Sequence, residues 1–477
     1  MPRLGLGLGL TMGNILGVSL ASTLADLYVA RVATIPDFVV PSYARVVAGY
    51  EALINAWAIG TKAALETATA MFADPSVSGY VPGAGTLLTA GAACARVGNM
   101  AWLDDNSRDL VQATPLNQPW LLVHTGTNYV AFPGVTQNFC STPNAAANQI
   151  TGDLRIDALH DVILSSLNEC YASKYLSSSQ FLLRKNSSNF LQLIGSRTAG
   201  AEDINATSTV AITAGLKWLR AFRQASTGDV SFFTSPDAIT WTQLGTTRST
   251  PVGNLVSGTD AVNIGIFSTT GNPLQGKLYR LLLATSLGGA PVLDFNPQLY
   301  NASVSQTTIP SSTGEVYTLN VGTATTGYKL AAVDKTIIQS NGIDTTFATL
   351  TIARNQPYTE YIVGQRLGIG NFLARATGNI RGHDATNYSL NNGVLLNLAN
   401  TSRNRQLLTY RSNGASSGMA INNGAETTGN AGTNNGTNIT VLGGNHSLNS
   451  LIVSTANDSG AARTAIYDYL KTINAGI

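Results

Sequence analysis

Two kinds of hydrophobic periodicity divide the chain. In its first part, apolar residues recur at helical intervals of three or four positions, as they do on one face of an amphipathic helix. The longest stripe lies between Ser42 and Ile59. A shorter one over Leu24–Val32 precedes it, and a third over Ala64–Phe72 follows it, ended by Asp74-Pro75. The pattern predicts three helices near the N-terminus that pack through their apolar faces.

From about Leu87 the pattern changes to short β segments separated by Gly, Asn, Asp, Ser and Pro. Asp153–Ala158 alternates polar and apolar residues strictly, as in a strand with one solvated face. Two pairs of segments are joined by turn-forming residues and predict hairpins: 181–185 with 190–194, and 230–233 with 239–242. Many short strands with turns between them are typical of a sandwich or jelly roll.

The chain therefore reads as mainly β, with two tandem jelly-roll sandwiches preceded by a small helical region and an extended arm. Residues 291–318 are rich in Pro, Ser, Thr and Asn, which indicates a boundary there. Residues 413–437 are of low complexity and are expected to form a surface loop. A last helix is predicted over 461–473, capped by Asp458 or Ser459. The predicted parts are an arm (1–22), a helical head (23–100), a first sandwich (101–293) and a second sandwich (294–477).

The composition supports a β-rich protein and excludes several classes of function. Charged residues make up only 11% of the 477 residues, apolar residues make up 44%, and the net charge is +2. Such a chain lacks the basic field that nucleic-acid binding needs, and it is too apolar to be disordered. No apolar run approaches the roughly 18 residues of a membrane span.

The N-terminal residues alternate Leu and Gly. They resemble a signal peptide in having one Arg and an apolar stretch, but the interspersed glycines weaken the helix that a signal peptide forms, so cleavage is not expected. We interpret residues 1–22 as an assembly arm, because glycine lets a backbone approach a neighbouring subunit closely. The alternative is that the arm packs on its own chain.

The sequence shows no spacing that indicates catalysis, so no catalytic, cofactor-binding or metal-binding residue is predicted and the protein is expected not to be an enzyme. None of the seven Glu has a carboxylate two or four residues away on a strand-like segment, as a glycosidase would favour. The cysteines show no CxxC spacing and are expected to be free and buried: Cys94, Cys140 and Cys170. The histidines lie far apart in the sequence: His124, His160, His383 and His446.

One cluster of oxygen donors is a candidate calcium site. Asp104, Asp105, Asn106 and Asp109 lie within one turn, and calcium favours such ligands. The competing interpretation is an Asx turn that saturates its own backbone. Because a turn explains the pattern equally well, no metal is assigned.

Several strings resemble the virion proteins of tailed bacteriophages. The segment 104–119 (DDNSRDLVQATPLNQP) is similar to one that precedes a laminin-G-like (concanavalin-A-like) jelly roll in those proteins, although Arg108-Asp109 replace the family's glycines. The strings that look like its first strands are 127–132 and 150–156, and 232–245 looks like its late hairpin. Residues 294–301 and 312–315 resemble the start of a second unit, and 462–473 resembles the closing helix.

The resemblance implies a virion structural protein, such as a head or tail fibre, spike or collar component on the capsid exterior or tail, that contributes to host attachment. The hydrophobic arm and the nearly uncharged surface predict a homo-oligomer, most simply a trimer, that binds other virion proteins of the capsid, portal or tail through its N-terminal region. The alternatives are a carbohydrate-binding adhesin or, further off, a polysaccharide depolymerase. For host glycan, the predicted contacts are aromatic and amide side chains of the second sandwich: Tyr358, Tyr361, Tyr388, Asn391, Asn392, Tyr410, Asn413 and the loop to Asn438. The alternative is that these tyrosines fill the core or a subunit seam and that the amides only build turns.

Overall fold

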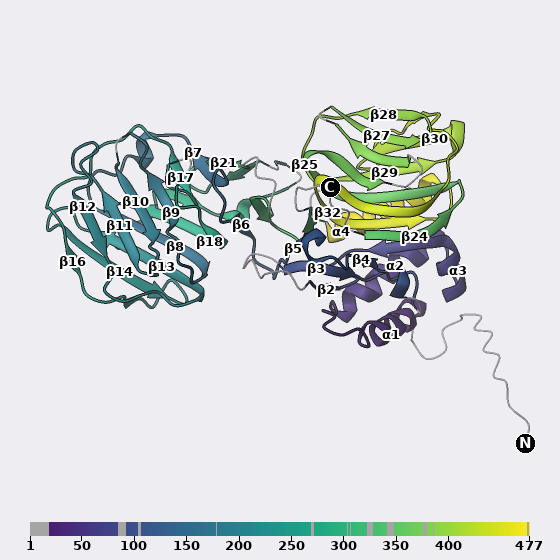
Figure 1. Ribbon diagram of the computed structural model, residues 1–477, viewed down its shortest axis with the longest axis horizontal. Helices are drawn as coiled ribbons and strands as arrows, with labels where there is room; N and C mark the ends of the chain where they lie inside the picture. Colours follow the sequence, from purple (N-terminus) through teal and green to yellow (C-terminus); the bar gives the residue numbers. More distant parts are fainter. Residues whose placement is uncertain are drawn as a thin grey trace, which may run out of the picture. The chain divides into compact units, whose positions relative to one another are not determined.

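The computed structural model divides the chain into two compact units (Figure 1). It describes residues 19–83, 92–103, 106–177, 179–268, 271–302, 304–305, 307–321, 328–340, 348–374, 379–384, 386–474 and 477. We call residues 86–92 and 120–343 the sandwich unit, and residues 1–85, 93–119 and 344–477 the helix-capped unit. Each unit is described by itself.

The sandwich unit consists of two antiparallel sheets, named here by one member strand. The β10 sheet has the order β12 (Ile204–Thr207), β11 (Leu191–Gly195), β10 (Phe181–Lys185), β9 (Glu169–Lys174), β17 (Val262–Ile264), β7 (Phe139–Thr142), β21 (Val316–Asn320) and β20 (Thr308–Pro310). The β13 sheet has the order β15 (Thr242–Gln243), β14 (Asp229–Ser235), β13 (Gly215–Arg223), β8 (Leu154–Val162), β18 (Gln275–Ala284), β6 (Tyr129–Pro133) and β22 (Ala331–Val333). β16 (Arg248–Ser249) pairs with β14, and β19 (Leu293–Phe295) pairs with β18.

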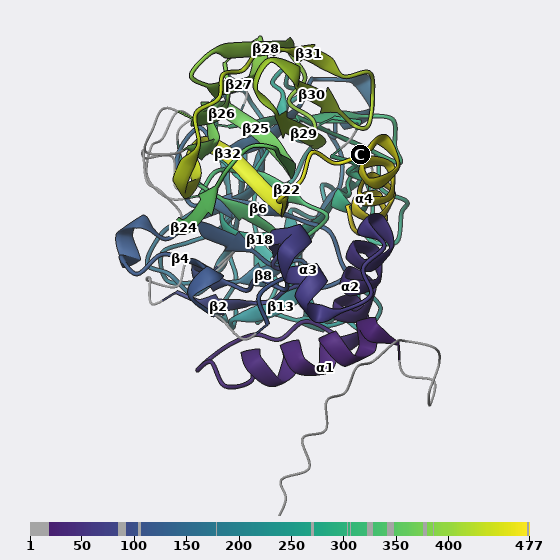
Figure 2. The same cartoon turned by 90° about the vertical axis from the view of Figure 1, so that its right-hand side faces the viewer.

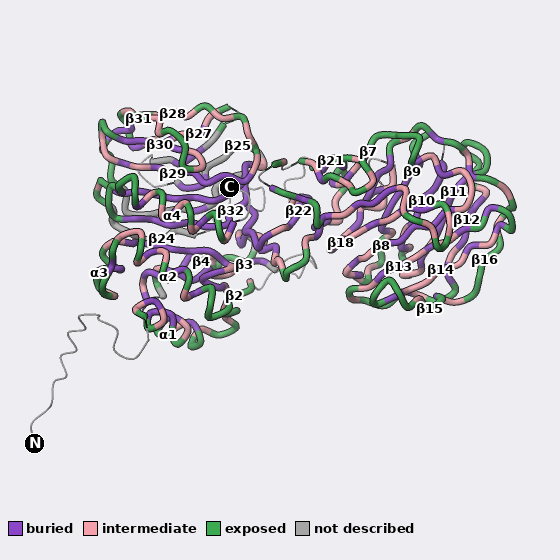
Figure 3. The backbone as a smooth tube through the Cα atoms, turned by 180° about the vertical axis from the view of Figure 1, so that it is seen from behind, coloured by how far each residue is buried: buried purple, intermediate pink, exposed green. Residues whose placement is uncertain are grey.

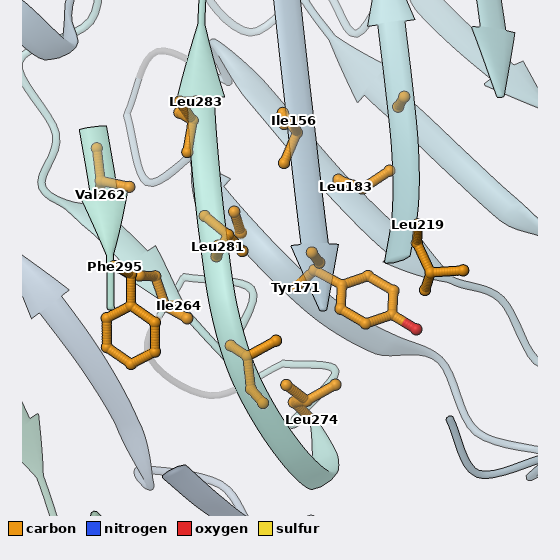
Figure 4. Packing of buried hydrophobic residues seen from close by; sticks show 14 of the residues in the cluster. Ile156, Tyr171, Leu183, Leu219, Val262, Ile264, Leu274, Leu281, Leu283 and Phe295 are labelled. Carbon is orange, nitrogen blue, oxygen red and sulfur yellow. The ribbon is translucent and has the colours of Figure 1, made fainter. Parts of the chain in front are cut away.

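The core of the sandwich unit lies between these sheets. Alternate residues of each strand point inward, and they meet in one cluster of buried side chains (Figure 4). Ile156, Leu219 and Leu281 come from the β13 sheet, and Leu183 and Ile264 come from the β10 sheet. The residues between these positions face outward, so each sheet also presents an outer face.

The helix-capped unit is organised by two long strands, β25 (Tyr358–Ala374) and β32 (Gly436–Ser454), which pair along most of their length. The first part of β25 also pairs with β29 (Gln406–Ser412), and its last part pairs with β26 (Asn379–His383). The ladder continues from β26 to β27 (Asn387–Asn392) and β28 (Leu395–Ala399), and from β29 to β30 (Ser417–Ile421) and β31 (Thr427–Gly429). β32 also pairs with β24 (Ala348–Arg354) and with β1 (Thr69–Ala73). The short strands β2 (Tyr80–Pro82), β3 (Ala92–Val97) and β4 (Leu110–Val111) pair with one another.

Helices cover one side of these strands (Figure 2): α1 (Leu20–Val32), α2 (Tyr43–Trp57), α3 (Lys62–Ala68) and α4 (Gly460–Ile473). Their apolar faces form a buried cluster with strand residues such as Tyr361 and Ile452. Ser19, Thr61 and Ser459 cap α1, α3 and α4 by accepting a backbone N–H bond. The predicted helical head and last helix are confirmed, and so is the mainly β fold. No helix in the described ranges is long and apolar enough to cross a membrane.

The division of the chain differs from the boundaries that the sequence predicts. The predicted break between residues 293 and 294 falls within β19, and β20, β21 and β22 also pair with strands of the sandwich unit. Ile309, Tyr317 and Leu319 point into its core, so 294–333 completes this sandwich and does not begin another. The helical head and the C-terminal strands belong to one unit rather than to separate domains.

Two smaller differences concern local structure. Residues 69–73, the end of the third predicted helix, form β1 because they pair with β32. The predicted loop 413–437 contains β30, which is largely buried, and β31, which is not (Figure 3). Most of the predicted arm (1–22) lies outside the described residues.

Candidate functional site

The outer face of the β13 sheet carries a group of aromatic and charged side chains. In the strand register, Arg220 of β13 lies between Asp157 of β8 and Phe233 of β14. Leu219 and Phe232, their sequence neighbours, point into the core, so these three residues point outward. We call Phe222, Phe233, Trp241 and Arg220 the aromatic face.

Ion pairs fix the arginine at the centre of this face. Arg220 donates two hydrogen bonds to Asp157, from Nε to Oδ1 over 2.7 Å and from Nη2 to Oδ2 over 2.8 Å. Arg155 lies on the other side of this carboxylate, with its Nε 3.3 Å from Oδ2. Burial lowers the pKa of Arg155, whereas Asp157 raises it. A bidentate pair of this kind holds the guanidinium in one plane.

Trp241 stacks on that plane. The Cζ atom of Arg220 lies 3.6 Å from the centre of the indole ring, and the ring Nε1 donates to the carbonyl of Ala238 over 3.0 Å. The loop before Trp241 is held by Asp237, whose Oδ1 accepts from the backbone N–H groups of Thr240 and Ile239 at 2.8 and 2.9 Å. These backbone bonds lower the pKa of Asp237. The indole is therefore positioned by the sheet and by its own loop.

Polar groups flank the aromatic rings. Gln243 lies directly across the strand from Phe233, and Ser231 lies across from Phe222, so each ring has an amide or a hydroxyl beside it on the same face. Thr247 joins the two polar groups, at 3.1 Å from Gln243 Nε2 and 2.9 Å from Ser231 Oγ. Phe222, Phe233 and Trp241 are each half-buried, so none of the three residues is fully enclosed by the protein.

Partly accessible aromatic rings with hydrogen-bonding groups beside them are suited to binding sugars. The C–H faces of a sugar ring stack on aromatic carbon, while its hydroxyls pair with amides, hydroxyls and charged groups. Phe222 lies one pleat, about 7 Å, from Arg220 along β13. Because the face spans several strands, its shape suits an extended chain of sugar units better than a single small molecule.

The tyrosines predicted to contact glycan lie elsewhere, and that prediction is wrong. The side chains of Tyr358, Tyr361, Tyr388 and Tyr410 are at most 1% exposed. The first three donate or accept hydrogen bonds inside the helix-capped unit, with Arg381, Asp458 and Gln406 as partners. Asn392 is buried beside them, so these side chains form a core.

This core holds a buried ion pair. Arg381 Nε lies 2.5 Å from Glu360 Oε2, and both residues are at most 1% exposed. The remaining nitrogens of Arg381 donate to Tyr358, Ser412 and Asn392 over 2.7, 2.9 and 3.0 Å. Arg381 and Glu360 are thus paired within the protein, and this buried network stabilises the unit.

The candidate calcium ligands are only partly described. Asp104 and Asp105 lie outside the described residues. Asp109 lies 3.2 Å from Arg31 and accepts from the backbone N–H of Asn99 over 2.7 Å. Burial raises the pKa of this carboxyl group, although Arg31 lowers it. Asp109 therefore links α1 to the strands of its unit. No group of three or more His, Cys, Asp and Glu suited to a metal ion occurs among the described residues.

The predicted free cysteines are all buried and free, as expected. His160 is also buried: its Nε2 lies 3.0 Å from the carbonyl of Gln275, and its ring packs edge-on against Tyr171. Burial lowers the pKa of His160 to about 4. Nearby, Lys185 and Glu169 form a wholly buried ion pair of 3.0 Å. These groups are enclosed by the sandwich and do not contribute to the aromatic face.

Nothing in the sequence alone brings the aromatic face together. Phe222, Phe233 and Trp241 come from different strands and a loop, and their proximity depends on the register of β13 and β14. One signal was available, because the hairpin that carries Phe233 and Trp241 is predicted from its turn residues.

No protein-family model matches this chain, and no curated protein sequence matches it. Among solved structures, it is similar to domains LG4-5 of the mouse laminin alpha1 chain, with 8% identity, a TM-score of 0.25, and coverage of 69% of this chain and 89% of that one. It is also similar to a heptameric SAP-like pentraxin from Limulus polyphemus, with 14% identity, a TM-score of 0.24, and coverage of 34% and 77%. A third is the CBM40 of the Ruminococcus gnavus IT-sialidase, with 11% identity, a TM-score of 0.24, and coverage of 33% and 92%. TM-scores this low carry no argument, so the fold follows from the strand pairing and the function from the site geometry.

Proposed function

We propose that this protein is a non-enzymatic, glycan-binding structural protein of the adhesin type, which binds polysaccharide through the aromatic face of its sandwich unit. The observation that carries the proposal is the set of three half-buried rings on one sheet face, with Trp241 stacked on the Arg220–Asp157 pair and Gln243 and Ser231 across from the two phenylalanines. Aromatic surface gives affinity for sugar rings, and the adjacent polar groups give orientation.

The expected affinity is weak for a single site. An open face buries only one side of a sugar chain, so we expect millimolar to high-micromolar binding, about −4 to −6 kcal/mol per site. Several copies in one assembly would strengthen attachment by raising the effective concentration of the remaining sites. Weak individual contacts and strong collective attachment suit a protein that adheres to a cell surface.

At a finer level, the proposal is a bacteriophage virion component on the capsid exterior or tail, namely a fibre, spike or collar protein that contributes to host attachment. Its support is the resemblance of 104–119 and the strings after it. A homo-oligomer, most simply a trimer, would attach to capsid, portal or tail proteins through the N-terminal region. Deletion of residues 1–20 should leave both units folded but abolish attachment to the particle, and normal incorporation of the truncated chain would contradict this docking role.

The absence of catalysis is part of the proposal. Asp157, the carboxylate on the aromatic face, is held by Arg220 and Arg155 and so is occupied as an ion-pair partner. We therefore expect the full chain to release no reducing ends from the polysaccharides it binds. Release that disappears on substitution of a Glu by Gln would support a depolymerase instead.

The binding experiment uses the full chain on a glycan array, followed by calorimetric titration of the strongest ligand. Trp241→Ala and Phe222→Ala should each lower affinity at least tenfold, because each removes a stacking ring. Val210→Ala is the matched control, since this side chain is 50% exposed and lies in the loop before β13. Equal affinity of Trp241→Ala and the wild type would refute the proposed site.

A further inference from the structure

The outer face of the β10 sheet carries a second candidate site, on the opposite sheet from the aromatic face. We propose that Arg184, Gln192 and Asn205 bind a carboxylate or sulfate group of an acidic polysaccharide. The choice of a polysaccharide as carrier of that group rests on the proposed function, whereas anion binding at Arg184 does not.

The strand register places these side chains on one surface. Arg184 of β10 lies opposite Gln192 of β11, and Asn205 of β12 lies diagonally beyond it. Leu183 and Leu193, their sequence neighbours, point into the core. The three polar side chains therefore point outward, and none of them is buried.

The hydrogen bonds along this row run in one direction. Arg184 Nε donates to Gln192 Oε1 over 2.8 Å, and Gln192 Nε2 donates to Asn205 Oδ1 over 2.8 Å. Each amide oxygen is thus used as an acceptor within the row. The groups that remain are donors: Nη1 and Nη2 of Arg184, the second N–H of Gln192 and Nδ2 of Asn205.

Arg184 differs from other arginines of the sandwich unit in its pairing. Arg197, Arg220 and Arg280 each have a carboxylate oxygen 2.7–2.9 Å from Nε. Among the described residues, no carboxylate lies within ion-pair distance of Arg184, and its Nη atoms have no hydrogen-bond partner. The bond from Nε to Gln192 nevertheless fixes the plane of the guanidinium. A held, unpaired fork of two N–H donors matches the geometry of a carboxylate or sulfate.

The surroundings of Arg184 favour a sugar that bears such a group. Tyr175 and Phe267 pack edge-on, with their ring centres 4.9 Å apart. They form a small apolar cluster with Cys170, the cross-strand neighbour of Arg184. Burial raises the pKa of the Tyr175 hydroxyl, Glu202 raises it further, and Arg184 lowers it, so both charged side chains act on this ring.

The test is a calorimetric titration of the full chain with one oligosaccharide in three forms: carboxylated, carboxyl-reduced and sulfated. Arg184→Gln should weaken the affinity for a charged form at least tenfold, because a charge-assisted hydrogen bond is lost. Its affinity for the carboxyl-reduced form, which has no such bond to lose, should equal that of the wild type. The carboxylated and sulfated arms identify which group the site prefers. Glu202→Gln should strengthen binding of the charged form by removing a nearby negative charge.

The matched control is Arg248→Gln, which removes the same charge from an exposed arginine of β16 on the other sheet. Its affinity for the charged forms should equal that of the wild type. The inference is overturned if Arg184→Gln binds the charged forms as tightly as the wild type, if Arg248→Gln weakens them equally, or if the wild type binds neither charged form. A Trp241→Ala variant distinguishes the two proposals. If its affinity for the oligosaccharide equals that of the wild type, the aromatic face is not the binding site and the proposed function fails. The result for Arg184→Gln decides the anion site independently.

Discussion

Replacement of Arg381 by methionine tests the energetics of the helix-capped unit. Arg381→Met keeps a long, apolar side chain in the core but leaves the carboxyl group of Glu360 buried without its cation. At pH 7 the cheapest response is protonation of Glu360, which costs about 3.7 kcal/mol for a group with an ordinary pKa near 4.3. The lost bonds to Tyr358, Ser412 and Asn392 add to this cost, so we expect a total loss of about 4–5 kcal/mol.

The pH dependence of this loss has a definite sign. In the variant, folding raises the pKa of Glu360, so the folded state binds more protons than the unfolded state above the ordinary pKa. Stability relative to the wild type therefore improves as the pH falls. At pH 5 the cost of protonation is only about 1 kcal/mol, so the variant should recover about 2.7 kcal/mol between pH 7 and pH 5.

Native-state hydrogen exchange with peptide resolution, measured over a urea series, reports the opening free energy of each unit separately. The loss should appear in peptides of the strands that carry this cluster, β25, β26, β27 and β29, with β8 and β13 of the sandwich unit as the internal reference. Arg381→Met combined with Glu360→Gln should abolish the pH-dependent part. A loss below about 1 kcal/mol at pH 7, or one that does not change with pH, would refute this account of the core.

Two further changes have expected outcomes. Burial lowers the pKa of His160 to about 4, so the wild type should lose about 3 kcal/mol of unfolding free energy as the pH falls from about 6.5 to 4. In His160→Gln this loss should disappear from the unfolding free energy of the sandwich unit, measured in urea at each pH. A variant with the same pH profile as the wild type would contradict this prediction. Gly432→Ala should lower the stability of the helix-capped unit by more than about 1 kcal/mol, because the backbone has φ +89° and the new Cβ would lie 2.2 Å from the carbonyl oxygen of Asn392. Gly414→Ala, at φ +55° with its nearest neighbour at 3.4 Å, is the control and should cost less in the same thermal or urea unfolding experiment.

The sequence predicted the helices and several strands well because their periodicity is local. The hairpin of β10 and β11 follows from apolar segments on either side of a turn, and the apolar stripe of α2 follows from its own spacing. The unit boundary was missed because the Pro- and Ser-rich segment around β20 reads as a linker. This segment belongs to the sandwich because β20 pairs with β21, and β21 pairs with β7, which lies far away in the sequence.

The candidate site could not be predicted for a related reason. A tyrosine in the sequence carries no sign of whether its hydroxyl will meet water or a buried partner. Tyr358 is buried and accepts a hydrogen bond from Arg381, and Tyr388 is buried and donates one to Gln406. Conversely, Trp241 belongs to the aromatic face only because the pairing of β13 with β8 and β14 sets Arg220 beneath its ring.

Hydroxyl-radical footprinting of the full chain, with and without a saturating concentration of the glycan that binds most strongly on the array, tests the central claim most directly. We expect oxidation of Phe222, Phe233 and Trp241 to slow in the bound state, because the sugar chain covers their rings. Tyr43, which is 45% exposed in the helix-capped unit, should be oxidised at the same rate in both states. Unchanged oxidation of the three rings in a saturated complex would contradict the assignment of this face as the glycan-binding surface.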